Sequence, residues 1–494
     1  MAIDTNGFLA YLNSGNTEND FSVFLNSLAD DENYQKITRN QNTIIVNERV
    51  YIQFNERLEN KYFNLSNITF NKEVTFKGNF EGLQFVFDNT HFKQLNIFDC
   101  KIDSIVFNGE THNRGEFNIS NCEIKTTIVD SNIQGNISFM KCKFDDFNML
   151  NADKNIDCAA KFIFNFCEVK GIANFMNFKF RDKVSFKMSN FRDNIYFNNS
   201  HFYDFADFHE CEFEKTACFY GATFDNPPNF SQAIFKENLN FVNVKCDFEF
   251  ENLKERIKQE KEQDSKKTLD KFANDFRDSF RLIKNALIKD NNLLDASNFH
   301  KYELYCKEIE LDSKNPKIFS KDFIDKWQLF FYRITSNHHT DLLKSFHSLL
   351  VVIGIFAFLN IATIIGFNCY CLQNISLSPY TLIAHHNAII KHLLNCNYIS
   401  LLGINFALAV VFILLFCFSL CSKIRKIIIS LSYFLVLLLL ISLPQYIIPT
   451  ISIFTDKRPL LDPLSIIGGI YTLLFAIMFF SLIKTARKNS IIPH

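Results

Sequence analysis

The chain has 494 residues, a length that suggests about three domains. Hydrophobic residues make up 48% of the sequence and charged residues 21%, a composition that excludes an intrinsically disordered chain. The formal net charge of −1 provides no bulk attraction for nucleic acid, so we expect no nucleic-acid partner.

The amino-terminal segment shows no sign of secretion. The first 20 residues have neither a basic start nor an apolar run of signal-peptide length, so we expect the amino-terminal half to be cytoplasmic. We assign residues 1–59 to an N-terminal cap region that precedes a long repeat.

Residues 60–250 contain a repeat of Phe at alternating spacings of five and six residues. The regular part comprises Phe175, Phe180, Phe186, Phe191, Phe197, Phe202, Phe208, Phe213, Phe219, Phe224, Phe230, Phe235 and Phe241. Two residues before these Phe lie small or branched side chains, such as Ser189, Ile195 and Ala222. This alternation with period two is typical of short strands, and we expect the Phe to form a structural ladder.

The repeat also predicts how the segments assemble. An eleven-residue period would suit a right-handed coiled coil, but steps of five and six do not keep side chains on one helix face. A unit this short buries its core only by stacking on its neighbours, so we expect a solenoid. We extend the same frame backwards through Phe117, Cys122, Ile128, Ile133, Phe139 and Phe144.

At this point the sequence resembles a known family. Units such as SNFRDNIYF, ATFDNPPNF and AIFKENLNF are similar to pentapeptide-repeat proteins. The resemblance implies a right-handed quadrilateral β-helix over residues 60–250, with about eight coils spaced by the strand separation of a sheet. Its cysteines fall on inward-facing positions. Cys122, Cys158 and Cys246 stand where the repeat has its large side chain, and Cys142, Cys167 and Cys211 stand where it has its small one. We interpret them as reduced core residues.

Residues 251–320 change from strand-like to helical periodicity. Apolar side chains recur three or four residues apart from Phe272 to Leu287, the pattern breaks at 290–292, and a second helix is predicted over 294–311. We expect this helical hairpin to cap the open end of the solenoid; a dedicated partner-binding surface is the alternative. The run SFRLIKNAL and the later stretch WQLFFYRITSNHHTDLLKSF resemble membrane-bound members of the family, although His338 and His339 depart from that pattern.

Residues 321–494 form the predicted membrane domain. Four apolar stretches, at about 345–367, 400–420, 427–447 and 463–483, have the length of about 20 residues that crosses a bilayer as a helix. No Lys, Arg, Asp or Glu lies in the middle of any of them. We therefore predict a four-helix membrane domain whose partner is the lipid bilayer.

Basic residues indicate the orientation, because cytoplasmic loops are enriched in Lys and Arg. The predicted cytoplasmic segments carry Lys321, Lys326, Arg333 and Lys344, then Lys423, Arg425 and Lys426, and finally Lys484, Arg487 and Lys488. The first connection contains only Lys391, while the third has Lys457 and Arg458 offset by two Asp. We expect a multi-pass protein of the cytoplasmic (inner) membrane with both termini in the cytoplasm.

The first connection also contains Cys369, Cys371 and Cys396, together with His385, His386 and His392. A disulfide among these cysteines is our candidate there, since the predicted outer compartment is oxidising. Their spacing matches no zinc pattern, so we expect no metal. The alternative is an interfacial helix over 374–399 whose polar groups are simply solvated.

The sequence predicts no chemistry. It has no Gly-rich phosphate loop, no HExxH and no GxSxG, so we expect no enzyme activity and no cofactor. Relatives that mimic DNA need a strongly acidic rod, whereas residues 61–250 hold 20 Lys and Arg against 25 Asp and Glu. We predict a rigid cytoplasmic β-helix for scaffolding an unknown protein partner at the membrane; the oligomeric state stays open.

The alternative function is transport or a channel-like role for the membrane domain, with the β-helix as its soluble part. Some relatives of this architecture end in an ion-channel pore, and a potassium filter needs a Gly-containing loop. The connection between the third and fourth spans has Thr450, Ser452 and Thr455 but no Gly. The spans also lack ionisable residues that would mark an ion path.

Overall fold

The computed structural model describes residues 37–40, 43–54, 61–108, 115–130, 134–149, 157–263, 267–371, 398–442 and 463–489. The chain divides into two compact units, Met1–Asn315 and Pro316–His494. The first unit contains the strands and the first three described helices, and the second contains the long apolar helices.

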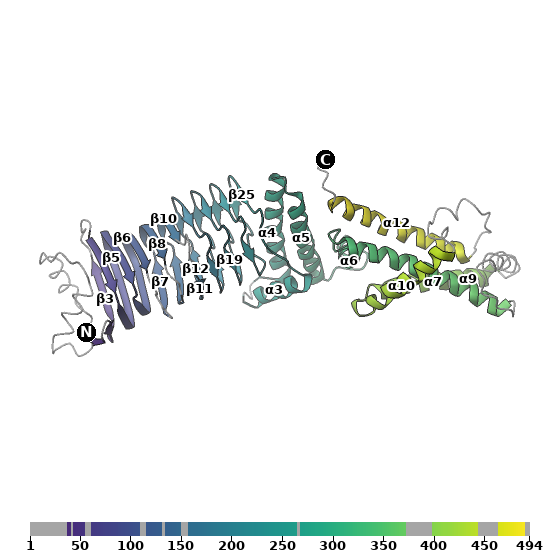
Figure 1. Ribbon diagram of the computed structural model, residues 1–494, viewed down its shortest axis with the longest axis horizontal. Coiled ribbons are helices and arrows are strands. Elements are labelled where there is room, and N and C mark those ends of the chain that lie inside the picture. Colours follow the sequence, from purple (N-terminus) through teal and green to yellow (C-terminus); the bar gives the residue numbers. More distant parts are fainter. Residues whose placement is uncertain are drawn as a thin grey trace. The chain divides into compact units, whose positions relative to one another are not determined.

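The first unit is a parallel β-solenoid of about eight turns, as predicted. Its earlier strands are β1 (Ile37–Asn40), β2 (Thr43–Val46), β3 (Val50–Phe54), β4 (Lys61–Ser66), β5 (Ile68–Asp88), β6 (His91–Asn108), β7 (Glu116–Ser120), β8 (Glu123–Asp130), β9 (Asn136–Met140) and β10 (Lys143–Met149). Figure 1 shows these strands stacked side by side in chain order.

The later coils have shorter sides. Their strands are β11 (Asp157–Cys158), β12 (Phe162–Asn165), β13 (Glu168–Val169), β14 (Ala173–Asn174), β15 (Lys179–Phe180), β16 (Val184–Ser185), β17 (Asn190–Phe191), β18 (Ile195–Tyr196), β19 (His201–Phe202), β20 (Ala206–Asp207), β21 (Glu212–Phe213), β22 (Ala217–Cys218), β23 (Thr223–Phe224), β24 (Ile234–Phe235) and β25 (Leu239–Asn240). Each pairs in parallel with the equivalent strand one coil away, for example β13 with β17 and β17 with β21.

Left-handed residues form two of the corners of each later coil. One corner has Asn177, Asn199 and Asn243 at φ of 58°, 56° and 59°, with Gly221 at 68° in the same position. Asn and Gly tolerate this conformation better than other residues, so the repeat selects them there. A Cβ at Gly221 would lie only 2.4 Å from Oδ1 of Asn199, so a side chain at this position would require the Asn199 amide group to move.

The frame predicted before residue 150 is wrong. Phe117 and Cys122 lie two residues from the predicted register, Ile128 is only partly buried between the buried Thr127 and Val129, and Ile133 lies outside the described residues. Ile124, and not Cys122, lies opposite Phe144, while Ile119, and not Phe117, lies opposite Phe139. Cys122 therefore occupies a small inward position next to this ladder, like Cys142. A shift by two residues leaves every side chain on the same face of a strand, so the hydrophobic pattern alone does not reveal it.

The parallel stack also extends beyond the predicted range of 60–250 at its beginning. Strands β2 and β3 pair in parallel with β5, so the first coil starts before residue 60. Strand β1 pairs antiparallel with β2 and lies next to this first coil in the sheet.

Three helices follow the last coil: α3 (Phe250–Gln263), α4 (Leu269–Lys289) and α5 (Leu293–Lys314). Helices α4 and α5 correspond to the predicted hairpin, and α3 precedes them. Phe276, Phe280 and Ile283 form the buried stripe of α4. The ring of Phe299 on α5 packs edge-on against Phe241 of the last coil, with centroids 5.8 Å apart. The hairpin thus covers the end of the solenoid (Figure 1).

The second unit comprises α6 (Lys321–Ser336), α7 (Leu342–Cys371), α9 (Tyr398–Ser419), α10 (Ser422–Ser442) and α12 (Pro463–Asn489). Four segments are long and apolar enough to cross a membrane, which confirms the prediction: Leu342–Thr363, Leu402–Ser419, Lys423–Ile441 and Ile466–Arg487. Helix α10 begins five residues before the predicted third span. Helix α7 contributes most of the buried core of this unit.

Candidate functional site

The predicted Phe ladder fills the interior of the solenoid. Twelve of its thirteen members are buried, and Phe235 in the last coil is partly buried. Rings one coil apart stack almost parallel, as in Phe186 with Phe208, whose centroids are 5.1 Å apart and whose planes differ by 2°. These side chains hold the coils together and are not accessible to a ligand.

Small polar side chains next to the ladder satisfy backbone carbonyls. Ser189 Oγ donates to the Phe164 carbonyl at 2.7 Å, and Cys211 Sγ donates to the Phe186 carbonyl at 2.8 Å. Burial raises the pKa of the Cys211 thiol and raises the pKa of the Cys158 thiol to about 12. These thiols therefore stay protonated and act as hydrogen-bond donors in the core, not as nucleophiles.

The outer cysteines lie only partly within the residues that the structure describes. Cys369 and Cys371 lie in the last turn of α7, whereas Cys396 lies outside the described residues, as do His385, His386 and His392. The proposed disulfide therefore stays a prediction. In the parts of the chain that the structure describes, no group of three or more His, Cys, Asp or Glu could hold a metal ion.

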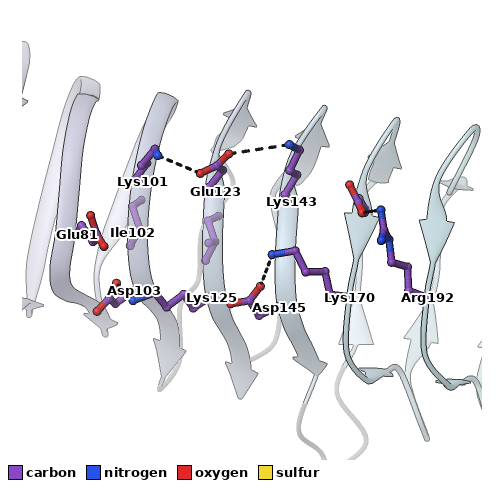
Figure 2. Close-up of a pocket in the computed structure, with 12 residues that line it drawn as sticks. Glu81, Lys101, Ile102, Asp103, Glu123, Lys125, Lys143, Asp145, Lys170 and Arg192 are labelled. Atoms are coloured by element: carbon purple, nitrogen blue, oxygen red, sulfur yellow. Dashed lines mark hydrogen bonds and ion pairs between the residues drawn. The ribbon is translucent and has the colours of Figure 1, made fainter.

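A charged surface runs along one side of the solenoid. It lines an open groove of about 440 Å³. We call its charged residues the charged ladder: Glu81, Lys101, Asp103, Glu123, Lys125, Lys143, Asp145, Glu168, Lys170 and Arg192. Five of them are acidic and five are basic, so the ladder is neutral as a whole. Figure 2 shows these side chains in rows across neighbouring strands.

The strand register creates this arrangement. Lys101 lies opposite Glu123, and Glu123 lies opposite Lys143, so signs alternate from coil to coil. The Glu123 carboxylate is 3.3 Å from Nζ of Lys101 and 3.9 Å from Nζ of Lys143. Equivalent residues in adjacent parallel strands are only about 4.8 Å apart, so like charges in this row would repel one another.

A second row runs parallel to the first. Lys125 pairs with Asp103 at 2.7 Å and Lys170 pairs with Asp145 at 2.9 Å. The hydrogen bond from Lys170 to Asp145 raises the pKa of the Lys170 ammonium group, which therefore remains charged at neutral pH. Arg192 pairs with Glu168, a residue of the first row, and so connects the two rows.

The charged ladder contributes little to the free energy of folding. Most of its side chains are about half exposed, and pairs of this kind contribute about 0–1 kcal/mol each. What the pairs do is hold the charges in fixed positions on a stiff frame. The result is a neutral surface with a defined order of positive and negative groups.

Sequence reasoning missed this surface. Opposite charges also lie one coil apart on the last coils, where Glu212 and Glu214 are 2.6 Å and 3.4 Å from Nζ of Lys236. The available signal was opposite charge at a separation of one coil, as in Lys101 and Glu123. The coil of 20 residues between Glu123 and Lys143 obscures that signal.

The fold and the apolar helices define a β-solenoid protein with a membrane domain. Residues 208–249 match the family model described as pentapeptide repeats (9 copies). The solenoid thus contains pentapeptide repeats, as the resemblance of the sequence implied, and the four apolar helices are consistent with a membrane-bound protein. No curated protein and no solved structure gave a significant match.

Proposed function

We propose that this protein is a non-enzymatic scaffold of the cytoplasmic membrane, whose solenoid binds a protein partner through the charged ladder. The observation that carries the proposal is the fixed arrangement of five acidic and five basic side chains along an open groove, with alternating signs in the row from Lys101 to Glu168. Complementary charge patterns of this kind give protein interfaces their specificity and register.

The chemistry of the groove favours a protein partner over other ligands. Nucleic acid presents a continuous negative charge, and the acidic residues Asp103, Glu123 and Asp145 would repel it. Small-molecule sites are usually enclosed and largely apolar, whereas this groove is open and charged. A protein segment with both signs of charge can match both rows.

The basic residues support a cytoplasmic location for the solenoid. Helices α7, α9, α10 and α12 follow one another as antiparallel spans, so the start of α7, the α9–α10 turn and the end of α12 belong to one membrane edge. Lys344, Arg425 and Lys484 all lie near this edge, and basic edges face the cytoplasm.

Partner capture from native membranes tests the scaffold. One variant combines Asp145→Lys with Lys170→Asp in the charged ladder. It keeps the ion pair but exchanges the positions of the positive and negative charges. The matched control exchanges Asp157, on β11 of the other sheet, and Arg181, directly after β15, which pair at 2.6 Å. We expect the first variant to lose at least tenfold of a captured partner and the control to lose none. Equal capture by both variants, or no stoichiometric partner, would contradict the proposal.

Orientation has its own test. Cys421 is exposed in the α9–α10 turn. A membrane-impermeant maleimide added to inside-out vesicles should label the native protein more than a Cys421→Ser variant. If that difference occurs only in right-side-out cells, the solenoid does not lie in the cytoplasm.

A further inference from the structure

Large apolar side chains are exposed just before the first membrane span. Ile318 and Phe319 precede α6 and are 72% and 87% exposed, while Ile324 and Trp327 on α6 are 57% and 52% exposed. Most exposed apolar residues of this unit lie on the spans themselves, where lipid covers them. This group lies outside the spans.

Helix α6 carries one apolar stripe with two different environments. Phe331, in its second half, packs against the core of the helix bundle, and its ring lies 6.2 Å from that of Phe416. Ile324 and Trp327 precede Phe331 by seven and four residues, so they continue the same helix face. The stripe is therefore buried at one end and exposed at the other.

Contacts at the buried end place α6 at a membrane edge. Ser348, in the second turn of α7, donates its hydroxyl to the Thr335 carbonyl at 2.7 Å. Phe416 lies in the last turn of α9. Both contacts thus join α6 to the ends of spans, and only five residues separate α6 from α7. The second half of α6 therefore lies at the same level as these ends of α7 and α9.

We propose that the first half of α6 is an in-plane membrane anchor. Ile318, Phe319, Ile324 and Trp327 insert at the boundary between lipid headgroups and acyl chains. Lys321 and Lys326, on the polar side of the helix, face anionic headgroups. Amphipathic helices rich in aromatic and basic residues bind bilayers in this way, and Trp is enriched at this depth.

The lipid surface is the occupant because the bilayer is already next to the stripe. The helix face that packs on the ends of the spans continues without interruption into the exposed residues, so a bilayer around the spans reaches them. Ser320 caps α6 by accepting a hydrogen bond from the Phe323 amide at 3.2 Å, which fixes where the helix begins. A second copy of the chain or another protein on this face is a distinct outcome of the experiment below.

The chain is suited to a direct test, because Trp327 is its one tryptophan. The full-length protein is reconstituted in phosphatidylcholine vesicles containing phosphatidylglycerol. Trp fluorescence is then quenched with iodide in the buffer and with lipids brominated at shallow or deep acyl positions. We expect several-fold weaker iodide quenching than for free N-acetyltryptophanamide, and stronger quenching by shallow than by deep bromines.

Two other patterns would overturn the anchor. Iodide quenching equal to that of the free compound, without quenching by lipid, would place Trp327 in water. Protection from both quenchers would place Trp327 against protein. Variants sharpen the result: Ile324→Glu should raise iodide quenching two- to threefold, whereas Leu329→Glu, on the opposite side of α6, should not. Equal effects of the two variants would also contradict the proposal.

Discussion

The side-chain hydroxyl of Ser279 on α4 accepts a hydrogen bond from the backbone amide of Phe230, with a distance of 2.8 Å. In the preceding coils the equivalent amides, those of Phe186 and Phe208, donate to the carbonyls of Asp207 and Asn229 in the next coil. No further coil follows Phe230, so Ser279 replaces that carbonyl. The helical hairpin therefore continues the hydrogen bonding of the solenoid as well as its packing.

Replacing Ser279 by Ala should destabilise the solenoid by about 1–3 kcal/mol, because the buried Phe230 amide would lose its acceptor. Denaturant unfolding followed by circular dichroism of the strands measures the change. Ser297→Ala on α5 is the control, since the hydroxyl of that partly exposed serine bonds to the Leu294 carbonyl within its own helix. Equal midpoints for the two variants would show that the hydroxyl does not complete the last coil.

Truncation of a side chain in the Phe ladder should lower the free energy of unfolding far more than the loss of the Ser279 hydroxyl. Phe208 stacks on both Phe186 and Phe230, with ring planes within 2° of parallel. Phe208→Ala leaves a cavity in this stack and should cost about 3–5 kcal/mol of the free energy of unfolding. The same measurement on Phe166 supplies the contrast, because its ring is exposed and its backbone is left-handed, with φ of 57°.

Phe166→Asn should be neutral or stabilising by up to about 1 kcal/mol, since Asn tolerates the left-handed conformation that Phe adopts there. A loss comparable to that of Phe208→Ala would mean that position in the repeat, and not burial, determines the cost. The two variants together separate the interior of the coils from their corners.

The regular half of the solenoid was predictable because each coil there has the same length. With every step fixed at 22 residues, Phe191 lies opposite Phe213 in the structure as the spacing required. Before residue 150 the coils differ in length, and period-two alternation does not distinguish Cys122 from Ile124 as the partner of Phe144. The charged ladder depends on that same register. The hydrophobic pattern therefore did not predict its ion pairs, although each charged residue is evident in the sequence.

Close helix packing in the bundle depends on Gly354. A Cβ at this position of α7 would lie 2.6 Å from Cβ and 2.8 Å from Cα of Ser432 on α10. Gly354→Ala should therefore separate the two helices and lower the thermal midpoint of the detergent-solubilised protein by several degrees. Trp327 fluorescence reports this transition. Gly403→Ala on α9 is the matched control, because nothing lies within 4 Å of its added methyl group. Equal midpoints would show that α7 and α10 do not need this contact.

The membrane unit should also depend on pH through His339. This residue lies in the turn between α6 and α7, with Nδ1 2.9 Å from Ser481 Oγ on α12. Burial, assisted by the nearby charge of Lys484, lowers the pKa of His339 from 6.5 to about 4. The neutral ring is therefore the form that the folded unit accommodates.

The sign of the pH effect follows from this lowered pKa. Between about pH 4 and 6.5 the unfolded chain binds a proton at His339 that the folded unit excludes, so stability is full above about 6.5 and decreases as the pH falls toward 4. Thermal midpoints from Trp327 fluorescence, measured between pH 5 and 7, avoid most carboxylate titration. His339→Gln should flatten the decline in this window, whereas His347→Gln should preserve it. A decline that His339→Gln leaves unchanged would assign the pH dependence to another group.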